Sequence, residues 1–144
     1  MTYRLYAFTN QYLATIQAGL QTAHVVAEMF CKYGNNEDVW LLDSASEDLP
    51  TAVLQHWADF DKTIIILNGG DNAAMRNLAE FLYSAPYPNA EFYESPDALY
   101  GLLTCCAVIV PEKLFGSTEE PMGHDLTAWD AEFMECKERC RLAT

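Results

Sequence analysis

Hydrophobic and polar positions alternate between strand-like and helix-like patterns along the chain. Residues 3–8 are rich in aromatic and aliphatic side chains and end at the polar loop Thr9-Asn10-Gln11, which is typical of a strand. Residues 16–33 change to helical spacing, and Gly34 marks the end of this helix. Its apolar residues recur at intervals of four and three and form one stripe, which we expect to face the core: Ile16, Leu20, Ala23, Ala27 and Phe30.

The middle of the chain predicts a second helix, a buried strand and a third helix. The second helix opens near Asp48 with Pro50 in its first turn. Its expected inward residues are Leu49, Val53, Leu54, Trp57 and Phe60. Residues 63–67 form an apolar, largely β-branched run, the mark of a strand covered on both faces, and a third helix follows at about 71–83. Residues 39–42 are a short apolar patch with no clear assignment.

The last part of the chain predicts two strands, at 90–94 and 105–110, with a loop or one helical turn between them. Residues 116–123 have the composition of a linker. A final helix from about Thr127 carries an apolar stripe that must cover either this chain's own sheet or a second copy: Leu126, Trp129, Phe133, Cys136 and Cys140. This order of strands and helices predicts an α/β domain with a mixed sheet in two or three layers.

Composition excludes several classes of protein. A chain of 144 residues is the length of one compact domain, and 51% hydrophobic residues exclude extended disorder. The net charge of −13 would repel a phosphate backbone and an anionic membrane surface, so we expect neither broad nucleic-acid binding nor membrane association. Since there is no apolar run of about 18 residues and no signal-peptide core, we expect a cytoplasmic protein.

The five cysteines favour reduced thiols rather than a disulfide framework, because their number is odd. Cys105 and Cys106 are adjacent in a strand-like run and should point to opposite faces, with Cys31 and one of this pair as small core residues. Cys136 and Cys140 lie one helical turn apart, downstream of His124 and Asp125, but a closed zinc site needs four ligands. We therefore predict no metal and no cofactor.

The first predicted helix also carries a polar stripe, formed by Gln17, Gln21, His24 and Glu28 at steps of four, three and four. The helix begins just after the first strand's loop, where ligand sites of α/β proteins lie. In one interpretation His24 and the glutamines recognise a polar group. In the other, the four residues are the solvated side of an amphipathic helix, and spacing alone favours this second interpretation.

A second candidate is the turn Gly69-Gly70 between a strand and a helix. Such a turn exposes backbone N–H groups beside the positive end of a helix dipole, where proteins hold phosphates or carboxylates. The alternative is a tight turn in which Asp71 or Asn72 caps the helix, and an Asp71 carboxylate would repel an anion. The glycine spacing matches no dinucleotide or phosphate-loop motif.

The segment at 16–24, directly after the opening strand, resembles the first helix of type II peptidyl-tRNA hydrolases. Members of that family have a Gly-Lys-x-x-x-Gln-x-x-His pattern there, and Gln21 and His24 fit its last two fixed positions. The order of elements is also similar, including a last strand that ends in a proline, here Pro111. The resemblance covers roughly Tyr3 to Pro111 and implies a mixed four-stranded sheet with helices on both faces. We therefore expect such a domain at 1–115, followed by the linker and the amphipathic helix at 116–144.

The chain departs from this family at the positions that carry catalysis. Gln17 stands where the family has its catalytic lysine, and a neutral amide cannot stabilise an oxyanion or transfer a proton as an ammonium can. Near the family's Asp-Ala-Gly turn this chain has Glu94-Ser95-Pro96, so only a carboxylate is kept. The resemblance therefore implies a hydrolase fold that keeps a pocket and has lost its chemistry, and we assign no catalytic residue.

We weigh three functions. The first is a non-catalytic protein that binds a small polar or nucleotide-like ligand, and its expected site residues are Asn10, Gln17, Gln21, His24, Gly69, Gly70 and Glu94. By analogy with small acidic proteins of phage and bacteria, sequestering a nucleotide signal is one conceivable task. The second is an esterase of the peptidyl-tRNA hydrolase kind in which His24 and Glu94 replace the lost lysine. The third is a protein-interaction module, with a homodimer formed through the C-terminal helix.

Overall fold

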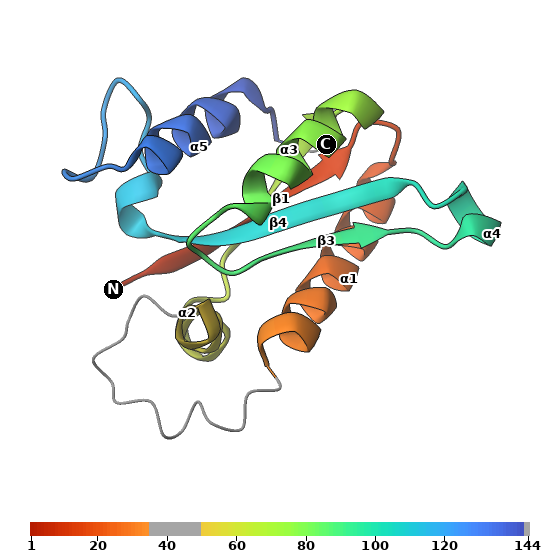
Figure 1. Cartoon of the computed structure of the whole chain (residues 1–144), viewed down its shortest axis with the longest axis horizontal. Helices are drawn as coiled ribbons and strands as arrows, with labels where there is room; N and C mark the ends of the chain where they lie inside the picture. The colour runs from red at the N-terminus through yellow and green to blue at the C-terminus, as the bar shows by residue number, and fades with distance from the viewer. Residues whose placement is uncertain (35–49, 143–144) are drawn as a thin grey trace.

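A four-stranded mixed sheet forms the centre of the protein (Figure 1). The computed structural model describes residues 1–34 and 50–142, so the apolar patch at 39–42 and the expected helix residues 48 and 49 lie outside the described residues. The strands are β1 (Tyr3–Asn10), β2 (Ile64–Gly70), β3 (Asn89–Tyr93) and β4 (Leu103–Pro111), in the order β2-β1-β4-β3. β2 pairs parallel with β1, whereas β4 pairs antiparallel with both β1 and β3.

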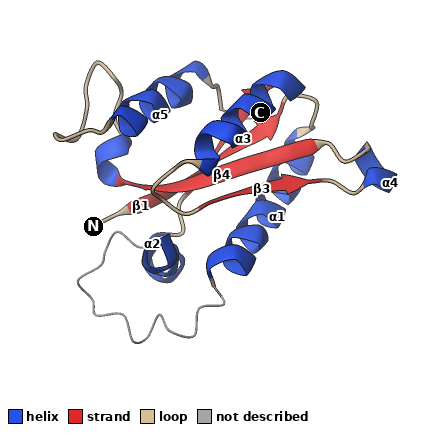
Figure 2. Cartoon of the chain, viewed as in Figure 1, coloured by secondary structure: helices blue, strands red, loops and turns tan. Residues whose placement is uncertain are grey.

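Helices cover both faces of the sheet, which confirms the predicted α/β architecture (Figure 2). α1 (Thr15–Tyr33) and α2 (Pro50–His56), with the π-helical turn η2 (Trp57–Asp61), pack on one face. α3 (Asn72–Tyr83) and α5 (Ala128–Arg139) pack on the other, and α4 (Pro96–Leu99) is a single helical turn between β3 and β4. A 3-10 turn, η3 (Glu112–Leu114), follows β4.

The two faces of the central strands supply two separate cores. In β1, Leu5 and Ala7 point toward α1 and α2, and Tyr6 and Phe8 point toward α3 and α5. Every residue of β4 is buried, as expected for a strand covered on both sides. The adjacent thiols of this strand follow the same alternation and point to opposite faces, as predicted.

The prediction that β2 is covered on both faces is wrong. β2 is an edge strand, and Ile64 is 41% exposed. The end of the chain protects part of its open side, because Asn68 donates a backbone hydrogen bond to Arg141 (2.7 Å) and Leu67 forms an isolated antiparallel bridge with Leu142. The β-branched run therefore reflects strand propensity rather than full burial.

The inward face predicted for α1 is also wrong. The predicted apolar stripe faces solvent, with Ile16 76%, Leu20 58% and Phe30 37% exposed. The face that packs on the sheet consists of Ala18, Gln21, Thr22, Val25 and Met29. Because α1 has apolar residues on two opposite faces, spacing could not identify the buried one.

In the second helical segment, Val53, Leu54 and Trp57 are buried as predicted, whereas Phe60 is 74% exposed. The helix changes from α to π geometry at Trp57, shown by the backbone hydrogen bond from Lys62 to Trp57 at 2.9 Å. A π turn holds more residues than an α turn, so residues three apart no longer share a face. The prediction for Phe60 assumed regular α-helical spacing.

The C-terminal helix packs on this chain's own sheet. Thr127 caps α5 by accepting a hydrogen bond from the Asp130 backbone N–H, and Phe133 and Met134 are fully buried against β1 and β4. Trp129 extends this packing by stacking on Phe133 with ring centroids 5.3 Å apart. Of the two alternatives for the helix's apolar stripe, the structure therefore shows coverage of its own sheet.

Further predictions concern a cysteine, metal binding and membranes. Cys31 is exposed on α1, so its placement in the core was wrong. Within residues 1–34 and 50–142, no three His, Cys, Asp or Glu side chains are grouped as they would be in a metal site. None of the helices described is long and apolar enough to cross a membrane.

Candidate functional site

A polar cluster joins α1 to the ends of β3 and β4, and Gln21 is its centre. The Gln21 side chain is buried, its Nε2 donates to Oε2 of Glu94 (3.0 Å), and its Oε1 accepts from the Thr104 hydroxyl (2.8 Å). Because one end of the amide meets an acceptor and the other a donor, its orientation is fixed. Two of the predicted site residues, Gln21 and Glu94, are thus in direct contact although they lie 73 residues apart in the sequence.

A β-bulge turns Thr104 toward this cluster. Across the β3–β4 pair, Phe92 lies opposite Cys105 and Tyr93 lies opposite Leu103, which leaves Thr104 as the extra residue of β4. A bulge of this kind redirects a side chain and is frequent beside functional sites. Here it places the hydroxyl of a fully buried threonine within hydrogen-bonding distance of α1.

Glu94 carries the negative charge of the cluster. Its pKa lies below the ordinary value for a glutamate, first because the backbone N–H of Ser95 donates to Oε1 (2.9 Å) and second because Gln21 donates to Oε2. The imidazole of His24 lowers the pKa further, by a smaller amount. A carboxylate has about four lone-pair sites, so these two hydrogen bonds leave it able to accept from a ligand.

His24 is exposed one turn after Gln21 and lies flat against Phe92 of β3. The two ring centroids are 4.6 Å apart and the planes differ by 9°. This stacking fixes the imidazole beside the Glu94 carboxylate and leaves its ring nitrogens available for hydrogen bonds. Gln21, His24, Phe92, Glu94 and Thr104 are called the Gln21 cluster below.

Gln17 and Asn10 have local roles in the fold. The Oε1 atom of Gln17 accepts from the Ala14 backbone N–H (3.0 Å), so its side chain turns back toward the start of α1. Asn10 Nδ2 donates to Oδ1 of Asn72 (2.7 Å) and Oδ1 accepts from the Tyr12 backbone N–H, which ties the end of β1 to α3 and to the following loop. Asn10 Nδ2 also donates to the backbone oxygen of Leu103 (3.4 Å), the residue before Thr104, but neither Asn10 nor Gln17 has a described hydrogen bond to the side chains of the Gln21 cluster.

The Gly69-Gly70 turn lies on the other face of the sheet, in a cleft of about 390 Å³ between α3 and α5. Gly70 has a φ of +97°, a conformation that favours glycine, and its carbonyl accepts from the Gln11 backbone N–H at 2.8 Å. The Asp71 carboxylate accepts from the Ala74 backbone N–H (2.9 Å) and thus occupies the N-terminus of α3. This geometry is that of the capped tight turn, the alternative to an anion site.

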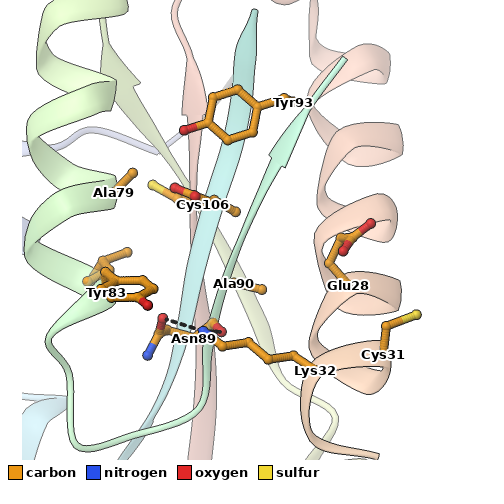
Figure 3. A pocket seen from close by; sticks show the side chains of 11 residues that line it. Glu28, Cys31, Lys32, Ala79, Tyr83, Asn89, Ala90, Tyr93 and Cys106 are labelled. Atoms are coloured by element: carbon orange, nitrogen blue, oxygen red, sulfur yellow. Dashed lines mark hydrogen bonds between the residues drawn. The ribbon is translucent and has the colours of Figure 1, made fainter. Parts of the chain in front are cut away.

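A groove of about 440 Å³ follows the outer edge of β3 between α1 and α3 (Figure 3). Lys32 of α1 reaches across its lower end, where Nζ donates to the backbone oxygen (3.2 Å) and to Oδ1 (3.3 Å) of Asn89. The same ammonium lies 5.3 Å from the ring centroid of Tyr83 on α3. Covering an edge strand with a charged side chain protects it against pairing with another chain. Glu28, the last member of the predicted polar stripe, lines this groove.

Sequence reasoning missed Phe92 and Thr104. The sequence could have pointed to Thr104, because it is the one hydroxyl residue in the otherwise apolar stretch 102–110. A polar residue that is buried in such a strand must find a hydrogen-bond partner. Nothing in the sequence pointed to Phe92 as a site residue, because aromatic residues are common in strands and usually belong to the core.

The hydroxyl and the amide of the cluster are bonded to each other. The Thr104 hydroxyl is fully buried and engaged with Gln21, so it is not presented as a nucleophile. No lysine takes part in the described hydrogen bonds of the cluster. No known family model matches the chain, and a search of curated proteins finds no match.

Proposed function

We propose that the protein is a non-catalytic binding protein that holds a small polar ligand at the Gln21 cluster. The observation that carries this proposal is the Glu94 carboxylate, which two donors fix at the rim of the cluster and keep ionised. A fixed anionic acceptor beside the exposed His24 ring favours a ligand with hydrogen-bond donors or a positive charge. The flat His24–Phe92 pair would pack against an apolar or planar part of that ligand.

Two observations argue against catalysis. Gln17, which corresponds to the lysine of type II peptidyl-tRNA hydrolases in the resemblance described above, is neutral and bonded to Ala14. Gln21 is engaged at both ends of its amide, so its donors and acceptor hold the cluster together. An oxyanion needs donors aimed at the point where its charge develops, and the Nε2 group of Gln21 donates to Glu94 instead.

The other functions considered from the sequence have less support. A nucleotide ligand would place negative charge near Glu94, and the α3 N-terminus already bonds to Asp71. A homodimer through the C-terminal helix would need apolar residues of α5, but Phe133 and Met134 are buried in this chain's own core.

Binding is tested by a thermal-shift screen followed by calorimetry. The probes are small amines and guanidines, namely putrescine, ethanolamine, agmatine and arginine, with AMP and a cyclic dinucleotide as anionic comparisons. A ligand present at 100 times its Kd adds about 2.7 kcal/mol to the free energy of unfolding. We expect a cationic probe to raise the melting temperature of the wild type and of Glu91→Gln, but not of Glu94→Gln.

Glu91→Gln is the matched control, because it removes the same charge from an exposed position of β3. If no amine or guanidine shifts the melting temperature, or if the shift persists in Glu94→Gln, the proposed site is wrong. Hydrolysis is tested separately by incubating the protein with peptidyl-tRNA and measuring released tRNA. Turnover by the wild type that disappears in His24→Ala would replace the binding proposal with the esterase.

A further inference from the structure

The sheet has an open edge at β3, beside the groove between α1 and α3. β3 is the last strand in the order β2-β1-β4-β3, and no strand of residues 1–34 and 50–142 pairs with its outer side. The backbone oxygens of Pro88 and Phe92 accept from residues of β4, at 3.0 Å and 3.3 Å, and the Glu94 N–H donates to the residue just before β4, at 2.9 Å. Because backbone groups alternate in direction along a strand, the residues at 89, 91 and 93 turn theirs outward.

The lower end of this edge is closed, whereas its upper part is open. The outward groups of Asn89 are occupied, because its N–H donates to the Tyr33 hydroxyl (3.3 Å) and its oxygen accepts from Lys32 (3.2 Å). In the part of the chain that the structure describes, nothing bonds to the outward backbone groups of Glu91 and Tyr93. These two residues offer two donors and two acceptors in a row, which is a template for a further strand.

The side chains beside the open edge form two unlike walls (Figure 3). The α1 wall carries the carboxylate of Glu28, which lines the groove, and that of Glu94, which is bonded to Gln21. The α3 wall presents the rings of Tyr83 and Tyr93, which are 75% and 51% exposed, and a hollow of about 300 Å³ continues the groove there. The charged residues on this second side are of both signs: Arg76, Glu80 and Glu91.

We propose that this edge binds an extended basic segment of a partner protein, which adds to the sheet as a further strand beside β3. In such a strand the side chains alternate between the two walls. Lysine or arginine at alternate positions then faces Glu28 and Glu94, and apolar residues between them cover the tyrosine rings. The inference deepens the function proposed above and rests on it, because the cationic group held at the Gln21 cluster is then a side chain of this segment.

Charge selects a basic segment over other partners. A chain of net charge −13 attracts a cationic peptide and repels nucleic acid and a second copy of itself. Two copies paired through their β3 edges would bring the carboxylates of Glu28, Glu91 and Glu94 from both chains to one interface. Lys32 cannot offset them there, because it is engaged by Asn89 at the closed end. Binding of the basic segment should weaken as salt rises, since salt screens the attraction.

The probe is the peptide acetyl-GKVKVKG-amide, in which lysine alternates with valine, and calorimetry measures its binding to the full chain. We expect it to bind at least tenfold more tightly than agmatine, because backbone hydrogen bonds and valine contacts add to the attraction between charges. The permuted peptide acetyl-GKKKVVG-amide has the same composition and charge. It should bind at least fivefold more weakly, because it cannot place lysine on one wall and valine on the other.

Two N-methylated forms of the probe test the backbone pairing on the wild-type protein. In an antiparallel pair the valines lie opposite Glu91 and Tyr93 and exchange backbone bonds with them, whereas in a parallel pair the lysine amides face β3. One form is methylated on the nitrogens of both valines, the other on those of the first two lysines. We expect one form to bind at least tenfold more weakly and the other to bind like the probe, and the sensitive set gives the direction of the added strand.

Variants test the two kinds of contact separately. Glu91→Pro removes an outward N–H but no bond to β4, and proline is tolerated on the outer side of an edge strand. It should bind the probe at least fivefold more weakly than Glu91→Gln, which loses the same carboxylate but keeps the N–H. Glu28→Gln should weaken the probe at least threefold, and Glu119→Gln is its control, because it removes an exposed carboxylate from the segment after η3. Circular dichroism checks that each variant is folded.

Failure of this inference and failure of the proposed function give different results. If agmatine binds and needs Glu94, but the probe binds no more tightly than agmatine or its two N-methylated forms bind equally, there is no added strand. The Gln21 cluster would then hold small molecules only. If neither agmatine nor the probe is weakened by Glu94→Gln, the proposed function is wrong as well. A dimer of the unliganded chain in sedimentation equilibrium that the probe dissociates would place a second copy on this edge and overturn the inference.

Discussion

The strongest stability prediction concerns Asp130, a fully buried carboxylate in the first turn of α5. Its oxygens are 3.0 Å from the Lys113 ammonium, 3.2 Å from the Tyr87 hydroxyl and 3.0 Å from the backbone nitrogen of Thr127. These bonds connect α5 to η3 and to the segment before β3. Asp130→Ala removes all three at once and leaves the partly exposed Lys113 ammonium without this carboxylate.

The loss in the free energy of unfolding caused by Asp130→Ala follows from these contacts. Removing one partner of a buried ion pair costs about 3–5 kcal/mol when the other charge stays buried. The Lys113 side chain is 33% exposed and can regain water, which favours the lower end of this range. The lost bond to the Thr127 N–H, half of a capping box, contributes about 1 kcal/mol of that total. We expect Asp130→Ala to lower the free energy of unfolding by about 3 kcal/mol.

Urea unfolding followed by circular dichroism measures this loss as a lower midpoint with an unchanged slope. Asp130→Asn, which keeps an acceptor but removes the charge, should lose less. Glu132→Ala is the control, because it removes an exposed carboxylate from the same helix, and surface changes stay within about 0.5 kcal/mol. A loss below about 1 kcal/mol for Asp130→Ala would refute the view that this carboxylate holds α5 in place.

Three further predictions follow from other contacts. Gly69→Ala would bring a new Cβ within 2.3 Å of the Met75 sulfur and should cost about 1–3 kcal/mol in urea unfolding; an unchanged midpoint would mean that the strand–helix contact is loose. The depressed pKa of Glu94 contributes stability above the ordinary carboxyl pKa, and this contribution is lost as the pH falls through the folded pKa. Gln21→Met should raise that pKa part of the way to its ordinary value in an NMR titration, and no change would show that the Gln21 bond is absent in solution. Burial raises the pKa of Cys105 to about 12, so this thiol should resist maleimide in the native protein and react after unfolding; rapid native labelling would contradict its burial.

The element order was predictable from the sequence because local signals agree with the fold. Asp71 at the N-cap of α3 and Thr127 at the N-cap of α5 each mark a boundary that the structure confirms. Runs of apolar residues predicted the strands in the same way. These signals act within a few residues, so they do not depend on long-range contacts.

The faces of the elements were less predictable, because burial depends on neighbours far along the chain. α1 has Ile16 and Leu20 on one side and Val25 and Met29 on the other, and hydrophobicity favours the first pair. The sheet instead buries the second pair. For a helix with two apolar faces, the choice is made by how closely each face fits the sheet, and spacing contains no information on that fit.

The residues of the candidate site could also be predicted only in part from the sequence. The resemblance to type II peptidyl-tRNA hydrolases singled out Gln21, His24 and Glu94, and the structure brings these three together. It does not bring Gln17 or Gly69 into contact with them, because Gln17 caps its own helix and Gly69 lies across the sheet. The partner of Gln21 is set by the bulge at Thr104, a feature of strand pairing that residue spacing does not encode.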